Sequence, residues 1–242
     1  MTTIPAPRTI DEPRQMLLNP GMDLTLRPMK YPHFFDRYKD AIKNTWTVEE
    51  VDLHGDLADL AKLTPAEQHL VSRLVAFFAT GDTIVANNLV LAIYRLITNP
   101  ECRQYILRQA FEEAIHTHAY QYIVESLDLD ESEIFNAYNE VPSIRAKDQF
   151  LIPFIDAIAD PNFKTGTPEA DQTLLKSLIV FACLMEGLFF YVGFTQILAL
   201  GRQNKMTGAA EQYMYILRDE SMHCNFGIDL INTIKLENPH LW

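Results

Sequence analysis

A chain of 242 residues with 48% hydrophobic and 21% charged residues has the composition of a globular protein with one large core. Its net charge of −12 excludes a surface that follows nucleic-acid phosphates or anionic lipid, because both require an excess of Lys and Arg. The 3 cysteines match no zinc or disulfide spacing, so we expect a reducing compartment, the cytoplasm, with no membrane and no nucleic-acid partner.

Residues 1–26 are rich in Pro and polar side chains and show no periodic pattern. They predict an extended N-terminal arm, followed by a helical body over residues 27–242. The arm lacks the continuous apolar segment of a secretory signal, so we expect no export.

Helix start signals divide the body. Thr64-Pro65 with Glu67 has the spacing of a capping box, and Asn99-Pro100 and Thr167-Pro168 each place a capping side chain before a proline. With Thr207, these signals predict four long helices, over residues 65–97, 100–127, 168–200 and 207–235. Shorter helices are expected near residues 32–45, 131–139 and 143–158. Since strand patterns are almost absent, the predicted fold is all-α, a long four-helix bundle with accessory helices.

The most apolar segment, residues 177–201, contains a single charged side chain, Glu186. Its length fits a membrane span, but the flanks lack aromatic belts and basic loops, which favours a buried helix of a soluble bundle. An ionised carboxylate in such a helix needs a partner, a proton or a metal ion. No Lys or Arg lies within two helical turns of Glu186, so the sequence leaves its partner to another helix.

Each half of the bundle repeats one pattern, an isolated acid followed on the next helix by Glu-x-x-His. The acid and the Glu are separated by about one helix and its return, and Glu and His at i and i+3 project from the same helix face. The six residues are Asp82, Glu113 and His116 in the first half and Glu186, Glu220 and His223 in the second. Four carboxylates and two imidazoles are the ligand set of dinuclear carboxylate bundles.

The donor atoms of this pattern suit iron or manganese, and the absence of thiolates makes structural zinc a poor fit. A single Glu-x-x-His is common on solvated helix faces, so the prediction depends on the duplication. One alternative stays open from the residues alone: a purely structural bundle whose acids are neutral or paired with bases elsewhere.

Neighbours of the pattern are assigned by their helix face. Glu112 and His118 are turned away from the His116 face or only partly toward it, and we expect them to be solvated or to contact a ligand from outside. Cys183 and Cys224 are expected to fill core space rather than to bind metal.

Tyr120 stands four residues after His116 and seven after Glu113, on the same inward stripe. A phenol at this place would lie beside the metals as an oxidisable group. Phe190, Phe194 and Ile216 are expected to supply apolar walls to the same cavity.

In these residues, the sequence resembles the small (beta) subunit of class I ribonucleotide reductase, and the resemblance extends from about Asp23 onward. The matching segments are WTVEEVD at 46–52, FFATGD at 77–82, FEEAIHTHAY at 111–120, MEGLFFYVGF at 185–194 and RDESMH at 218–223. The resemblance implies a ferritin-like bundle whose six acids and histidines bind a dinuclear iron centre, with dimanganese or manganese–iron as alternatives.

The resemblance also implies roles for three further residues. Tyr120 carries a radical, and an electron path runs from His116 through Asp219 to Trp46. The implied activity is reduction of ribonucleoside diphosphates by a separate large (alpha) subunit, with this chain as a homodimer. Tyr at position 120, where one subgroup has Phe, favours a tyrosyl radical over a mixed manganese–iron oxidant. Another ferritin-like di-iron oxidase, oxygenase or ferroxidase is the alternative function.

Members of that family continue beyond the position of Trp242 into further helices and a tail that docks on the large subunit. We therefore expect this chain to lack those helices and that tail. Metal binding should survive such a loss better than turnover.

Overall fold

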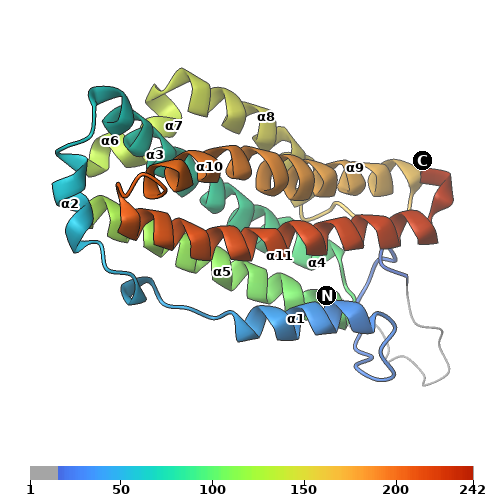
Figure 1. The fold of residues 1–242 in the computed structure, drawn as a ribbon. Coiled ribbons are helices and arrows are strands. Elements are labelled where there is room, and N and C mark those ends of the chain that lie inside the picture. The colour runs from blue at the N-terminus through green and yellow to red at the C-terminus, as the bar shows by residue number, and fades with distance from the viewer. Residues whose placement is uncertain (1–15, 242) are drawn as a thin grey trace, which may run out of the picture.

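The computed structural model describes residues 16–241, and every regular element among them is helical (Figure 1). Four long rods form the bundle: in chain order, the first and fourth run in one direction and the second and third run in the opposite direction (Figure 1). The first comprises α3 (Pro65–Asn88), the π-helical η2 (Leu89–Ile93) and α4 (Tyr94–Leu96); the second is α5 (Pro100–Ser126); the third comprises α9 (Pro168–Ile179), the π-helical η3 (Val180–Phe189) and α10 (Phe190–Gly201); the fourth is α11 (Thr207–Glu237). The predicted all-α bundle of four long helices is confirmed.

Three of the predicted helix starts carry the expected caps. The side chain of Thr64 accepts a hydrogen bond from the backbone N–H of Glu67 at 3.3 Å, Asn99 accepts one from Cys102 at 3.0 Å, and Thr167 caps α9 in the same way. Each cap satisfies one of the free N–H groups at a helix start. These bonds lie within four residues of chain, so the sequence alone predicts them.

The start of α11 is capped from another helix. The buried carboxylate of Asp56, in α2 (His54–Leu60), accepts hydrogen bonds from the backbone N–H groups of Gly208 at 3.0 Å and Ala209 at 2.6 Å. The close approach requires glycine at position 208, because a Cβ there would lie 2.4 Å from the backbone oxygen of Asp52. The boundary at Thr207 was predicted correctly, but its cap was not visible in the local sequence.

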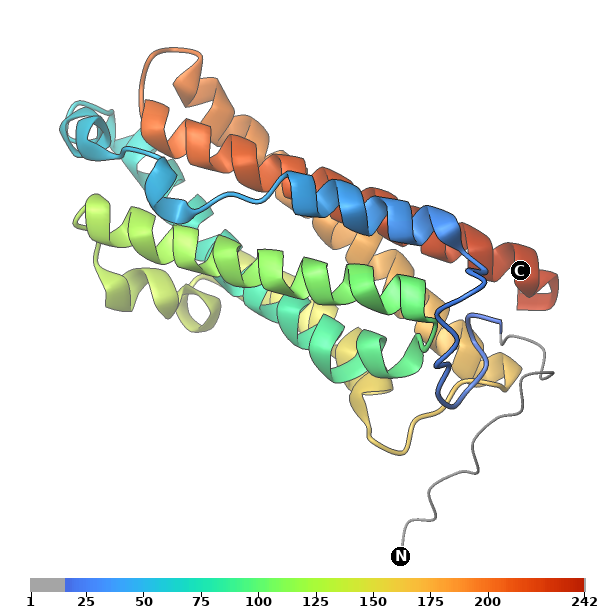
Figure 2. The same cartoon turned by 90° about the horizontal axis from the view of Figure 1, so that it is seen from below.

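Accessory helices surround the bundle. Residues 32–45, 131–139 and 143–158 were predicted to be helical, and the structure has α1 (Pro32–Lys43), α6 (Glu131–Phe135) with α7 (Ala137–Glu140), and α8 (Pro142–Ala159) in those places. Helix α1 lies along α5 and α11 (Figure 2). The additional elements that the sequence did not predict are α2 and two short 3₁₀ turns, η1 (Val48–Glu50) and η4 (Pro239–Leu241).

Part of the predicted N-terminal arm can be located. Residues 1–15 lie outside the described residues, and residues 16–26 form no helix. Leu17 and Leu18 are buried, and the backbone N–H of Leu17 donates to the carboxylate of Glu237 at the end of α11. The start of this described part therefore packs against the bundle, whereas Met22, Leu24 and Leu26 are exposed.

Two of the rods, Pro65–Leu96 and Pro168–Gly201, are long and apolar enough to cross a membrane. Their most apolar windows are 61% and 50% buried inside the bundle, and each carries a buried acid, Asp82 or Glu186. Burial against other helices explains their apolar composition without a membrane, as expected for core helices of a soluble protein.

Candidate metal centre

The four rods bring all six predicted ligands together in the interior. Each of these side chains is at most 3% exposed. One group comprises Asp82, Glu113, His116 and Glu220, and a second comprises Glu186, Glu220 and His223; within each group the ligand atoms lie within 4.8 Å of one another. Glu220 belongs to both groups.

Two glutamates lie between the two histidines. The Nδ1 atom of His116 is 3.1 Å from a Glu220 oxygen and 3.7 Å from a Glu113 oxygen. The Nδ1 atom of His223 is 3.2 Å from the other Glu113 oxygen and 3.5 Å from the other Glu220 oxygen. Glu113 and Glu220 thus each place one carboxylate oxygen beside each imidazole, so both glutamates could bind metal.

The polar atoms that converge here lack hydrogen-bond partners among the described residues. They are both oxygens of Glu113, both oxygens of Glu220, Oδ1 of Asp82, and the Nδ1 atoms of His116 and His223. Buried polar atoms are normally satisfied, and buried acids in such numbers repel one another unless cations lie between them. The donor set therefore fits a pair of divalent cations, and its oxygen-rich character fits iron or manganese.

In the absence of cations, some of these acids must take up protons, because so many neighbouring negative charges would repel one another. Burial, with the charge of Glu220 beside it, raises the pKa of Glu186 well above its usual range. Burial likewise raises the pKa of Asp82 to about 7, although the nearby imidazole of His116 opposes the shift. Burial also acts to raise the pKa of Glu220, but the neighbouring His223 and His116 outweigh this effect and lower the pKa to about 2. The four acids of the cluster outnumber its two imidazoles, so the imidazoles alone could not balance four ionised carboxylates.

Glu186 has a partner that the sequence did not predict. The side-chain amide of Gln109, on α5, donates to both carboxylate oxygens of Glu186, at 3.1 and 3.3 Å. Glu186 itself lies in η3, the π-helical part of its rod, which the sequence also did not predict. π-Helical segments inside longer helices are frequent at functional sites.

Outside the cluster, a chain of contacts leads from His116 toward the surface. Its Nε2 atom lies 3.2 Å from Oδ2 of Asp219, and the same oxygen accepts a hydrogen bond from the indole N–H of Trp46 at 2.7 Å. The ring of Trp46 stacks on the half-buried ring of Tyr215, with centroids 5.4 Å apart. The structure thus brings together Trp46, Asp219 and His116, the three residues that the resemblance links.

The second histidine has an acid on its outer side as well. Nε2 of His223 lies 2.9 Å from Oε2 of Glu112, which is fully buried. Of the two environments expected for Glu112, the solvated one is wrong. His118 is solvated, with 54% of its side chain exposed. Cys183 and Cys224 are half-buried and belong to neither ligand group.

Tyr120 is fully buried beside the first ligand group. Its hydroxyl donates to Oδ2 of Asp82 at 2.9 Å, and burial, with the nearby Asp82 charge, raises its pKa well above the usual value. The rings next to it are Phe78 and Tyr213, at centroid distances of 5.9 and 6.0 Å.

The predicted walls of this cavity lie one layer farther out. Phe194 and Phe190 pack on Phe78, at 4.7 and 5.4 Å, rather than forming ring contacts with Tyr120, and Ile216 is buried. Phe78 stands four residues before Asp82, one helical turn away, which is the signal that identifies it as the nearest ring.

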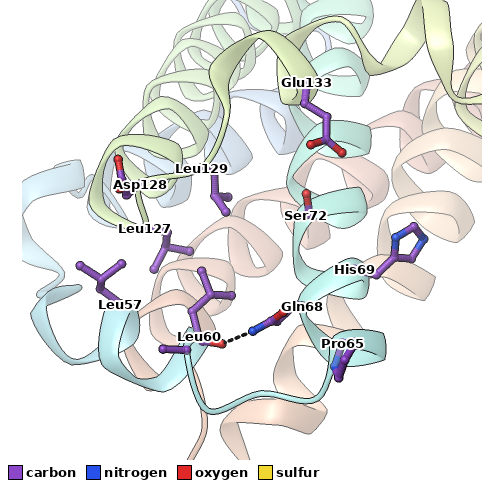
Figure 3. Close-up of a pocket in the computed structure, with 11 residues that line it drawn as sticks. Leu57, Leu60, Pro65, Gln68, His69, Ser72, Leu127, Asp128, Leu129 and Glu133 are labelled. Atoms are coloured by element: carbon purple, nitrogen blue, oxygen red, sulfur yellow. Dashed lines mark hydrogen bonds between the residues drawn. The ribbon is translucent and has the colours of Figure 1, made fainter.

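A surface pocket of about 540 Å³ lies elsewhere, between α2, the start of α3 and the loop after α5 (Figure 3). Among its lining residues are Leu57, Gln68, His69 and Glu133, and none of the predicted ligands or radical-path residues contributes to it. The six predicted ligands and the residues around them therefore lie in the packed interior and not in this pocket.

Comparison with known proteins gives a consistent result. Residues 23–242 match the family model "Ribonucleotide reductase, small chain". The chain is 51% identical to the ribonucleoside-diphosphate reductase subunit beta of Chlamydia pneumoniae, over 90% of this chain and 63% of that protein. It is 32% identical to the small chain of Nicotiana tabacum, over 92% of this chain and 65% of that one. It thus spans less than two thirds of the length of these relatives.

Solved structures share the fold. The ribonucleotide reductase R2 subunit from Clostridium botulinum superposes with a TM-score of 0.84 at 26% identity, covering 94% of this chain and 70% of that one. An R2-like ligand-binding oxidase with a reconstituted Mn/Fe cofactor has a TM-score of 0.71 at 21% identity, covering 88% and 73%. By its sequence match over residues 23–242, its 51% identical relative and its bundle, this chain belongs to the ribonucleotide reductase small-chain family.

Proposed function

We propose that this chain is the radical-generating small subunit of a class I ribonucleoside-diphosphate reductase. The observation that carries the proposal is the hydrogen bond from the fully buried Tyr120 to Asp82, beside two groups of buried ligands. The line from His116 through Asp219 to Trp46 supports the same function over other di-iron oxidases.

Asp82, Glu113, His116, Glu186, Glu220 and His223 are the proposed ligands of a dinuclear iron centre, with dimanganese or manganese–iron as alternatives. When bound, these metals would supply one-electron oxidising power after reaction with an oxidant. The four carboxylates and the Nδ1 atoms of the two histidines would hold the two cations.

Tyr120 is the proposed radical residue. When its ring loses an electron, its hydroxyl proton has an acceptor 2.9 Å away, Oδ2 of Asp82. The ring then carries a neutral radical, and Phe78 with the aromatic layer behind it excludes water. Tyr213 is also fully buried and lies next to Tyr120, but its hydroxyl has no hydrogen-bond partner among the described residues. Tyr213 therefore lacks a proton acceptor, which favours Tyr120.

Asp219 is the proposed connection between the metal centre and the surface. Its Oδ2 atom holds both the N–H of Trp46 and Nε2 of His116, so electron and proton movements along this line need no side-chain rearrangement. We propose that the oxidising equivalent leaves by this route for a separate large subunit, where a ribonucleoside diphosphate is reduced.

The cytoplasm is the proposed location of this protein.

Tyr120→Phe tests the radical assignment. The ferrous form of the full chain is prepared without oxygen, air is added, and the electron paramagnetic resonance spectrum is recorded. The parent should give a phenoxyl signal, and the variant should give none while binding as much iron, because only the hydroxyl is removed. Tyr213→Phe is the matched control and should keep the signal. A signal that survives in Tyr120→Phe would contradict the assignment.

A homodimer is also proposed, through an apolar patch made by η2 and α5. Its members Val90, Leu91, Leu107 and Phe111 are each more than half exposed, and η2 packs against α5. Exposed apolar groups of this kind mark association sites, and one patch can pair with its own copy about a two-fold axis.

Phe111→Glu should therefore convert the dimer to a single chain, because two buried charges would face each other across the interface. The mass in solution is measured by light scattering after size exclusion. Phe150→Glu, at a 44% exposed site on α8, is the control and should leave the mass unchanged. A parent that is already a single chain would end this part of the proposal.

A further inference from the structure

The duplication in this chain extends one residue beyond the predicted ligands. Each Glu-x-x-His is preceded directly by an acid, Glu112 before Glu113 and Asp219 before Glu220. In the structure the two acids are exchanged: Asp219 of α11 contacts His116 of α5, and Glu112 of α5 contacts His223 of α11. Each histidine therefore has an outer acid supplied by the opposite helix.

Glu112 is held on both of its oxygens. Oε2 lies 2.9 Å from Nε2 of His223, and Oε1 accepts a hydrogen bond from Nε of Arg108 at 3.0 Å. Arg108 is itself buried, at 6% exposure, and its Nη2 donates to the backbone oxygen of Ala41 at 3.3 Å. The network thus runs from His223 to the C-terminal end of α1.

This network constrains the imidazole of His223. A carboxylate at Nε2 fixes the proton on that nitrogen and leaves Nδ1 free to face the ligand group, where it lies 3.2 Å from Glu113. Arg108 neutralises the charge of Glu112, so this carboxylate can remain buried without itself contacting a metal ion. The role of Glu112 differs from that of Asp219, because its second partner is Arg108, whereas the second partner of Asp219 is Trp46.

We propose that Glu112 is a positioning residue for the second metal position, the one formed by Glu186, Glu220 and His223, and that Arg108 anchors it to α1. This inference rests on the proposed function, since it needs a dinuclear centre. Glu112 touches no reacting atom and acts only through His223.

Glu112→Gln tests the proposal. A carboxylate offers an acceptor to both His223 and Arg108, whereas an amide has only one acceptor oxygen, so one of the two buried donors loses its partner. Mn²⁺ is titrated into the metal-free full chain and followed by calorimetry, and crystals soaked in Mn²⁺ give an anomalous map that reports each position separately. Glu125→Gln, at an exposed site on the same helix, is the matched control.

In Glu112→Gln, Mn²⁺ binding at the second position should weaken by about ten- to a hundred-fold, the usual effect of losing such a partner. The first position, formed by Asp82, Glu113, His116 and Glu220, should keep its affinity. A purely structural role would weaken both positions together or neither, and either result would overturn the proposal. If Glu112→Gln does not fold, Glu112→Asp decides, because it keeps the charge but shortens the reach by about 1.5 Å.

For Glu112→Asp the same selective loss is expected, and unchanged binding at the second position would refute the assignment. Failure of the underlying function is distinguishable: a parent chain that binds no Mn²⁺ would overturn the dinuclear centre and this inference with it. A parent that fills both positions, with a Glu112→Gln variant that does the same, overturns this inference alone.

Discussion

A Glu220→Gln variant should lose both metal ions, because both ligand groups found in residues 16–241 contain Glu220. The amide removes a negative charge and one acceptor oxygen from a place where both histidine Nδ1 atoms lie within 3.5 Å. We expect bound iron to fall from about two ions per chain to well below one. Iron content is measured after anaerobic loading and removal of free metal.

Glu186→Gln is the informative comparison for this loss, because Glu186 belongs to the second group only. It should lower the iron content by about one ion and leave the first group loaded. Glu125→Gln, an exposed acid on α5, should bind as much as the parent. Full loading of Glu220→Gln would show that Glu220 is not shared between two ions.

A Phe78→Ala variant should lose about 3–5 kcal/mol of unfolding free energy, the usual cost of removing a buried phenyl ring. Phe78 is fully buried, and the centroids of Phe194, Tyr213, Phe190 and Tyr120 lie between 4.7 and 5.9 Å from its own. Because four aromatic side chains from α5, α10 and α11 share this contact, they have no single way to close the cavity. Urea unfolding followed by circular dichroism measures the loss.

Phe150→Ala is the control for this experiment. Phe150 lies on α8 and is 44% exposed, so its removal should cost much less. Phe78→Leu should fall between the two, since it refills part of the space. Equal losses in Phe78→Ala and Phe150→Ala would mean that the aromatic layer around Tyr120 does not hold the bundle together. Under the proposed function, Phe78→Ala should also shorten the lifetime of the Tyr120 radical by admitting water.

The sequence by itself determined the four long helices, three accessory helical regions and much of the site. Caps at Thr64, Asn99 and Thr167 form bonds within four residues, and the spacing of Glu113 with His116 and of Glu220 with His223 follows from one turn of helix. Such local patterns persist in any fold that keeps the helix. The number of residues between each isolated acid and its Glu-x-x-His pair then predicted that all six side chains lie at one level of the bundle.

Tertiary structure alone decided which side chains meet between helices. A shift of one position turns a side chain by about 100° around its helix, so the sequence could not assign Glu112 to His223 or Gln109 to Glu186. The same holds for Asp56, which caps α11 from 152 residues away. The π-helical segment around Glu186 likewise has no local signal in the sequence. These features depend on how four helices are rotated against one another, and packing of the whole core fixes that rotation.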